Sequence, residues 1–323
     1  MTSPRTTQLI LLMAIPAAWL SPTLAQATAY WLLILSLPLL GMPHGAMDWP
    51  LLKQLKRRGA IRSLSQVTAF YTFAMACCLA GVLAAPWLAA VLFLVLTAWH
   101  FGFEDAHHRG TQSARPAIGM HSYALARGLV LVASVCVANP GQATRPFAII
   151  AGSQAPLSES IISLIALVIL IPAALSLTIM SFRQTVSRSA RNHEITEHAL
   201  VLILGLTAPP LFTIAVYFFA IHSLRHTKRL SEELGISFWQ LHLASLPWLI
   251  PALLAIPACH LLLHTTTINL ETVATAIILS FMIATPPHHA LDLMTTHNLF
   301  TTKPAEAPSP TTPSSGKLTT LKA

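Results

Sequence analysis

The chain has 323 residues, of which 54% are hydrophobic and only 9% are charged, and its formal net charge is +8 at pH 7. Soluble domains carry about 25% charged residues, so this composition excludes an ordinary water-soluble protein. The basic residues lie in the connections between apolar segments and do not alternate with aromatic residues, which argues against a nucleic-acid-binding protein and indicates membrane topology instead.

Long apolar segments follow one another along most of the chain. A helix needs about 20 mainly apolar residues to cross the roughly 30 Å hydrocarbon core of a bilayer. Segments of this kind occupy residues 8–25, 27–40, 67–85, 86–101, 117–137, 161–182, 199–221, 241–263 and 272–285. We therefore predict an all-α fold, a polytopic membrane helical bundle with about eight to ten transmembrane helices.

The ends of the chain differ from its middle. Residues 1–28 are predicted to form an N-terminal span that is retained, because Arg5 is the only basic residue before an apolar part that Pro16 and Pro22 interrupt, unlike a secretory signal. Residues 29–299 are expected to form the main membrane domain. Residues 300–323 are rich in Pro, Ser and Thr and are predicted to be a disordered tail.

Basic residues give the expected orientation. Five of them crowd residues 53–62, so this loop is predicted to be cytoplasmic. Residues 197–230 are long for one span and contain Pro209-Pro210 near the middle. A helical hairpin that turns at these prolines returns the basic residues at 225–229 to the cytoplasm. This arrangement gives about ten crossings of the inner cell membrane, with both termini cytoplasmic.

The chain holds 15 histidines, and four motifs near the ends of apolar segments contain those of greatest interest. They are GMPHGAMD at 41–48, WHFGFED at 99–105, HSLRH at 222–226 and PPHHALD at 286–292. Ionisable residues at membrane spans are costly and are by default functional. In the hairpin topology, the four motifs lie at the cytoplasmic ends of their spans, as a shared site requires.

The HSLRH motif gives the strongest local signal for a metal. His222 and His226 are four residues apart, so on a helix they project from one face about a turn apart. Neutral imidazole suits iron, zinc, copper and nickel, so the spacing does not select the metal. The alternative is that these are two unrelated histidines at the membrane interface, beside Arg225.

In the other three motifs, a carboxylate follows a histidine by four residues. The pairs are His44 and Asp48, His100 and Glu104, and His288 and Asp292. A metal-bound histidine usually donates its second ring N–H to a carboxylate or a carbonyl. The three acids are therefore predicted to orient histidines, within or across motifs. The alternative is that they only mark the membrane boundary.

Together, the four motifs resemble those of the Brp/Blh family, the membrane β-carotene 15,15'-dioxygenases of bacteria and archaea. The likeness covers roughly residues 30–295, which makes residues 29–299 the expected catalytic domain. The resemblance implies non-haem Fe²⁺ held by four histidines, which match His44, His100, His222 and His226. It also implies that dioxygen cleaves the central 15,15' double bond of β-carotene to give two all-trans-retinal molecules.

Other residues receive supporting roles. Since four ligands satisfy the resemblance, His288 and His289 are predicted to line the cavity or to bond to the ligands. The aromatic residues beside the motifs are predicted to line a tunnel for a polyene dissolved in membrane lipid. They are Trp99, Phe101, Phe103, Tyr217, Phe218 and Phe219.

Two other functions stay open from the residues alone. A histidine-lined metal-ion transporter would place its ligands near the membrane midplane, often on broken helices, whereas these motifs cluster at one face. A di-iron membrane hydroxylase or desaturase would need more closely paired histidines, and only His222/His226 and His288-His289 qualify. The favoured function has a carotenoid, dioxygen and membrane lipid as partners.

Overall fold

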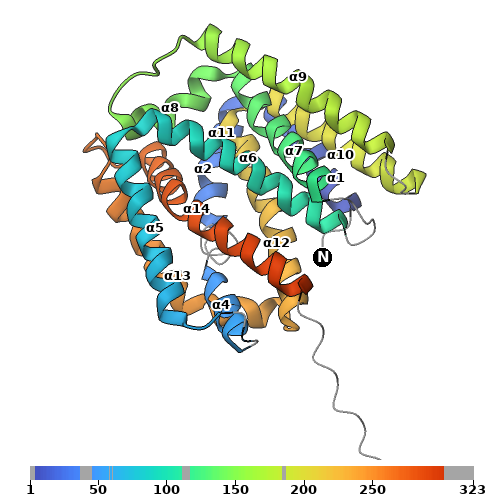
Figure 1. Cartoon of the computed structure of the whole chain (residues 1–323). Coiled ribbons are helices and arrows are strands. Elements are labelled where there is room, and N and C mark those ends of the chain that lie inside the picture. The colour runs from blue at the N-terminus through green and yellow to red at the C-terminus, as the bar shows by residue number, and fades with distance from the viewer. Residues whose placement is uncertain are drawn as a thin grey trace, which may run out of the picture.

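The computed structural model of the chain describes residues 4–36, 46–57, 59, 61–110, 117–183 and 187–301, with the side chains of 4, 36, 107–110, 117–118, 183 and 295–301 excepted. Within these ranges the chain forms helices and no strand (Figure 1). The predicted all-α fold is therefore confirmed. Of the predicted disordered tail, residues 302–323 lie outside the described residues.

The helices succeed one another with short connections. In chain order they are α1 (Pro4–Leu20), α2 (Pro22–Ser36), α4 (Asp48–Arg57), α5 (Leu64–Ala84), α6 (Pro86–Gly110), α7 (Ala117–Ala138), α8 (Pro140–Ala151), α9 (Glu159–Arg183), α10 (Arg188–Thr207), α11 (Pro210–Tyr217), the π-helical turn η2 (Phe218–His222), α12 (Ser223–Leu234), α13 (Phe238–Leu261) and α14 (Leu270–Thr301).

Six helices among the described residues are long and apolar enough to cross a membrane. They comprise Leu64–Ala84, Pro86–Ala106, Gly119–Ala138, Glu159–Phe182, Phe238–Leu261 and Leu270–Met294. The chain is thus an integral membrane protein with a polytopic helical bundle, as predicted. The prediction of eight to ten crossings also requires helices that are shorter or more polar than these six. Those helices are α1, α2, α10 and α11.

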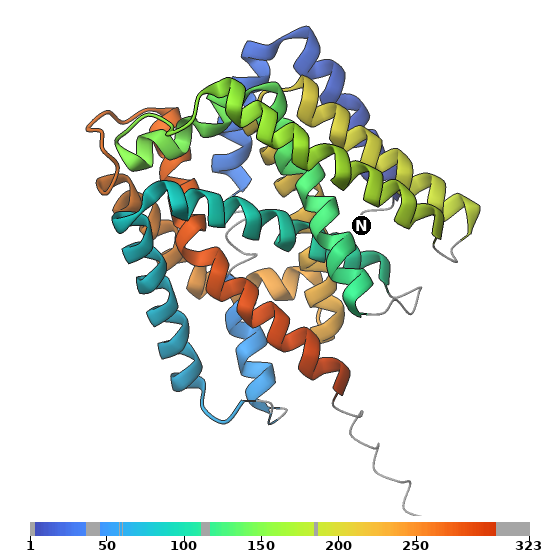
Figure 2. The same ribbon diagram turned by 45° about the horizontal axis from the view of Figure 1, so that its top comes forward.

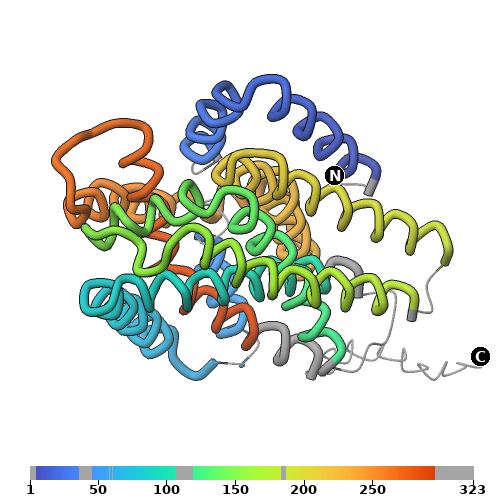
Figure 3. The backbone as a smooth tube through the Cα atoms, turned by 90° about the horizontal axis from the view of Figure 1, so that it is seen from above, coloured from blue at the N-terminus to red at the C-terminus, as the bar shows by residue number. Residues whose placement is uncertain are grey.

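Proline divides the apolar sequence into helices. The first apolar segment, which was expected to be one span, forms two helices, because Pro22 begins α2 directly after α1 ends. Proline suits the first turn of a helix, where its missing N–H would have no partner in any case. Figure 3 shows α1 lying along α10, and Leu11 of α1 shares a hydrophobic core with Leu204 of α10.

The predicted break within residues 197–230 is confirmed. Helix α10 ends at Thr207, Ala208 is extended, and Pro210 begins α11. From there, α11, η2 and α12 follow one another without a break, so that residues 210–234 are continuously helical. This second arm of the hairpin carries the HSLRH motif into the interior.

Helices α6 and α14, which carry the WHFGFED and PPHHALD motifs, hold central places in the bundle. Figures 1 and 2 show α14 crossing the middle of the bundle, with α5 and α13 nearby. Helix α6 is fixed against α7 by two glycines. A Cβ atom on Gly102 would lie 1.7 Å from the Ala124 carbonyl oxygen, and one on Gly128 would lie 1.6 Å from that of Ala98. Such close backbone approach is typical of membrane helix pairs with small residues at the contact.

Candidate metal centre

Histidines from three of the four motifs meet inside the bundle. His100 of α6 lies against His222 of η2, with ring centroids 4.9 Å apart. The ring of His288, on α14, lies 5.3 Å from His100 and 5.6 Å from His226 of α12. All four side chains are buried. The expected convergence of the motifs is thus seen for three of them, whereas His44 lies outside the described residues.

The helix type changes locally at the start of the HSLRH motif. Residues Phe218–His222 form a π-helical turn, in which the backbone N–H of Ser223 donates to the carbonyl of Phe218, five residues back. Single π-turns are rare and often occur at functional sites. The rings of His222 and His226 are 6.4 Å apart and nearly parallel, at 25°. The sequence spacing indicated a shared face but gave no sign of the π-turn.

Asp48 holds His288 from another part of the chain. The Nδ1 atom of His288 lies 2.8 Å from Oδ1 of Asp48, which is in the first turn of α4. The hydroxyl of Tyr71 donates to Oδ2 of the same carboxylate at 2.9 Å. A histidine whose one nitrogen is bound to a carboxylate is oriented to offer its other nitrogen, as metal ligands commonly are. Asp48 therefore bonds to a histidine of another motif, while its role in orienting a metal ligand stays a prediction.

Glu104 and Asp292 share one cation. The Nη2 atom of Arg229 donates to Oε1 of Glu104 at 2.5 Å and to Oδ1 of Asp292 at 2.6 Å. Oε1 of Glu104 also lies 3.2 Å from Nδ1 of His226, so this acid contacts a histidine of a different motif. Arg229 was missed from the sequence, where it read only as a topology charge, although its position three residues after His226 puts it on the same helix face.

His289 lies at the edge of the cluster. Its Nδ1 atom is 2.9 Å from Nδ1 of His100, so one of the two rings donates to the other. The side of its ring packs edge-on against Trp99, with centroids 4.4 Å apart. These contacts place His289 beside the cluster, in keeping with the supporting role predicted for it.

The described residues contain two compact groups of potential ligands besides the ring cluster. His100, His289 and Asp292 form one, and Glu104, His226 and Asp292 form the other, with ligand atoms within 4.8 Å of one another in each. Both include Asp292, which is also paired with Arg229. The buried imidazoles are a further candidate donor set, and imidazole suits iron, zinc, copper and nickel.

Several of the aromatic residues beside the motifs contact the histidine cluster, while their predicted role in lining a tunnel stays a prediction. Phe101 lies 4.5 Å from His222 between centroids, and Phe218 stacks on the same ring at 5.8 Å. Phe103 contacts His289 at 5.8 Å. Tyr217 differs, because its hydroxyl donates to Asp105 at 2.7 Å and is thereby tied to a polar network.

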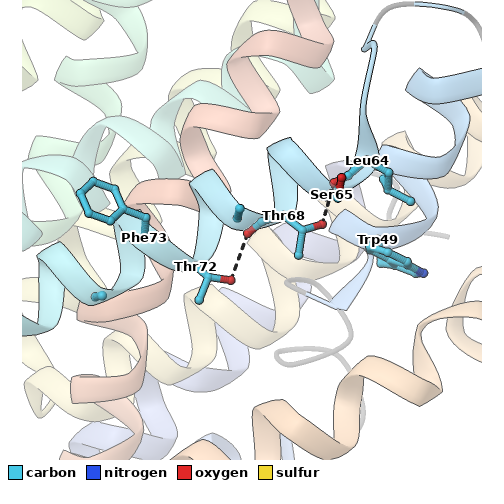
Figure 4. A pocket seen from close by; sticks show the side chains of 8 residues that line it. Trp49, Leu64, Ser65, Thr68, Thr72 and Phe73 are labelled. Atoms are coloured by element: carbon cyan, nitrogen blue, oxygen red, sulfur yellow. Dashed lines mark hydrogen bonds between the residues drawn. The ribbon is translucent and has the colours of Figure 1, made fainter.

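An apolar groove of about 900 Å³ runs along α5 (Figure 4). The hydroxyls of Thr68 and Thr72 donate to backbone carbonyls one turn back, at 2.9 and 3.0 Å. Because these donors are already hydrogen-bonded within the helix, they are not offered to a ligand in the groove. Trp49 of α4, which follows Asp48 in the chain, also lines the groove. The lining residues are Trp49, Leu64, Ser65, Thr68, Ala69, Thr72, Phe73 and Ala76.

The fold and the site define an integral membrane protein with a buried, histidine-lined centre suited to a transition metal. A comparison with protein families gives the more particular result. The family model for beta-carotene 15,15'-dioxygenase matches residues 35–294, and the chain belongs to this family. The resemblance of the four motifs is thereby confirmed. No curated protein and no solved structure matches the chain.

Glu104 provides a graded test of how the site is held together. We expect Glu104→Ala to lower metal affinity or turnover by about 10- to 100-fold, since a partner of His226 is lost. Glu104→Gln should be milder, because an amide oxygen still accepts a hydrogen bond. Metal content and initial rate would be measured with and without added Fe²⁺. Wild-type values for both variants would mean that Glu104 only marks the membrane boundary.

Proposed function

We propose that this protein is a carotenoid cleavage dioxygenase, which uses Fe²⁺ and dioxygen to cleave the central 15,15' double bond of β-carotene to two all-trans-retinal molecules. The observation that carries the proposal is the buried meeting of His100, His222 and His226 in a member of the beta-carotene 15,15'-dioxygenase family. Family membership supports this function over a metal-ion transporter or a di-iron hydroxylase.

Under this proposal, His44, His100, His222 and His226 would hold the iron. Bound Fe²⁺ would supply the activation of dioxygen. The chain contributes buried imidazole donors and keeps the nearby acids occupied, since Arg229 binds both Glu104 and Asp292. Asp48 fixes the ring of His288, and Glu104 contacts that of His226, so the imidazoles keep their orientation.

The substrate is expected to reach the site from the bilayer. A long polyene dissolves in lipid, so it would arrive sideways between helices without crossing water. The groove along α5 is apolar, and Trp49, the residue after Asp48, is part of its lining. Phe101 and Phe218 pack against His222 and against each other, and such flat apolar surfaces suit a conjugated chain.

The proposed location is the inner cell membrane, with both termini cytoplasmic. The five basic residues at 53–62 support this orientation, because cytoplasmic loops are enriched in Lys and Arg. Lys53 lies 5.4 Å from the ring of Trp49, a pairing suited to the boundary between lipid and water.

Expression in bacteria that accumulate β-carotene tests the proposed function. Chromatography of the extracts should show loss of β-carotene and appearance of retinal, whereas cells with the empty vector should keep their pigment. Apocarotenoids longer than retinal would show that cleavage is not central. Unchanged β-carotene, with the protein inserted in the membrane, would contradict the proposal.

His288 tests the four-histidine set. We expect His288→Ala to lower turnover while iron remains bound, because the resemblance already supplies four ligands. Iron per chain would be measured by elemental analysis beside Asp48→Asn, which keeps the ring but weakens its anchor. If His288→Ala loses iron as completely as His222→Ala, then His288 is itself a ligand and the set is wrong.

A further inference from the structure

A closed ring of buried charges lies next to the histidine cluster. It comprises Asp105 of α6, Arg127 of α7, Glu197 of α10 and Arg225 of α12, alternating in sign. The contacts around the ring are Asp105 to Arg127 at 2.9 Å, Arg127 to Glu197 at 2.7 Å, Glu197 to Arg225 at 2.8 Å and Arg225 to Asp105 at 2.5 Å. Each side chain is at most 3% exposed. Buried charges in a membrane bundle are costly and point to a function.

The ring also bonds to both sides of the π-turn. Tyr217 immediately precedes the turn, and its hydroxyl donates to Oδ2 of Asp105 at 2.7 Å. Arg225 follows the turn by three residues and donates to Oδ1 of the same carboxylate. Asp105 therefore spans the segment that carries His222.

The π-turn explains how both residues reach one carboxylate. Successive residues of an α-helix are rotated by about 100°, so Tyr217 and Arg225, eight positions apart, would differ by about 80° around the axis. A π-turn contains one more residue than an α-turn and so removes about 100° of that rotation. The two side chains are then about 20° apart, on one face. An α-helical turn would move one of them away from Asp105.

We propose that this ring, together with Tyr217, is a positioning device that holds the π-turn and thereby aims His222 and His226 at His100. The ring joins four helices, so the register of the turn is fixed against the helix that carries His100. Its members do not touch the reacting atoms and are positioning residues. The identity of the metal rests on the proposed function. The contacts of Asp105 with Tyr217 and Arg225, which hold the π-turn, do not depend on it.

Tyr217→Phe tests the proposal, because it deletes one hydroxyl and leaves the ring of the side chain in place. Tyr123→Phe is the matched control, since Tyr123 is also buried and its hydroxyl lies 3.0 Å from His198, so that this contact joins α7 to α10 and does not involve the segment with the turn. Amide hydrogen exchange would be followed in peptides covering residues 217–226, and Fe²⁺ affinity and the electron paramagnetic resonance spectrum of the nitric oxide adduct would be measured.

We expect Tyr217→Phe to speed exchange across the turn, to weaken Fe²⁺ binding by about 10-fold and to change the spectrum of the adduct, with excess Fe²⁺ restoring occupancy. Tyr123→Phe should leave all three unchanged. Equal behaviour of the two variants, or faster exchange throughout the protein, would overturn the positioning role. A wild-type protein that binds no Fe²⁺ would remove the proposed function, and the exchange comparison would then decide by itself whether the ring holds the turn.

Discussion

Replacing His222 with Ala is expected to empty the metal site and to abolish cleavage, while the protein still inserts and folds. His222 is fully buried, and its ring lies 4.9 Å from that of His100 and 6.4 Å from that of His226. Loss of its imidazole removes the donor that links α6 to α12. Iron per chain and retinal formation should both fall to the background of the assay, and His226→Ala and His44→Ala should do the same.

His260→Ala is the matched control for this prediction. His260 is also a histidine of a membrane helix, but it is bonded to Thr272 near the end of α13. Its loss should leave iron content and turnover near those of the wild type. Iron retained by His222→Ala at the wild-type level would mean that the metal is held elsewhere.

Replacing Arg229 with Ala is expected to be the most destabilising of the proposed single changes. The side chain of Arg229 is 11% exposed and neutralises Glu104 and Asp292, which are 1% and 2% exposed. Removing one partner of a buried ion pair costs about 3–5 kcal/mol, because the remaining charge stays buried without compensation. The apparent melting temperature of the purified protein in detergent should fall accordingly.

Two further variants check the cause of that loss. Asp292→Asn in the Arg229→Ala background should recover part of the stability, because one uncompensated charge is removed. Arg145→Ala breaks an ion pair with Glu271 in which Arg145 is 63% exposed, and it should cost only about 0–1 kcal/mol. If Arg229→Ala lowers the melting temperature no more than Arg145→Ala does, the ion pairs of Arg229 with Glu104 and Asp292 do not stabilise the fold.

Much of the architecture could be predicted from the sequence. Apolar segments of about 20 residues are dictated by bilayer thickness, and the expected break at Pro209-Pro210 is present, because a residue before a proline disfavours the α conformation and Ala208 is extended. The division of the first apolar segment was missed, because Pro22 was taken as an interruption of one span and not as the start of α2.

The histidine motifs also predicted the place of the site, but not its internal bonds. The spacing of four residues left open whether the carboxylates act within or across motifs, and the structure shows contacts across motifs, from Asp48 to His288 and from Glu104 to His226. Which helices are neighbours decides such pairs, and one chain's spacing does not contain that information. Arg229 and the π-turn were missed for the same reason, since both depend on tertiary packing.

We propose that a redox-active iron in this protein is required to cleave a carotenoid with dioxygen. The most direct measurement uses metal-free protein loaded with either Fe²⁺ or Zn²⁺ and supplied with β-carotene, with and without dioxygen. The Fe²⁺ form should give two retinals for each β-carotene consumed, only when dioxygen is present, and the Zn²⁺ form should give none, because zinc has no redox chemistry. Equal retinal formation by the Zn²⁺ form, or by the Fe²⁺ form without dioxygen, would contradict the claim.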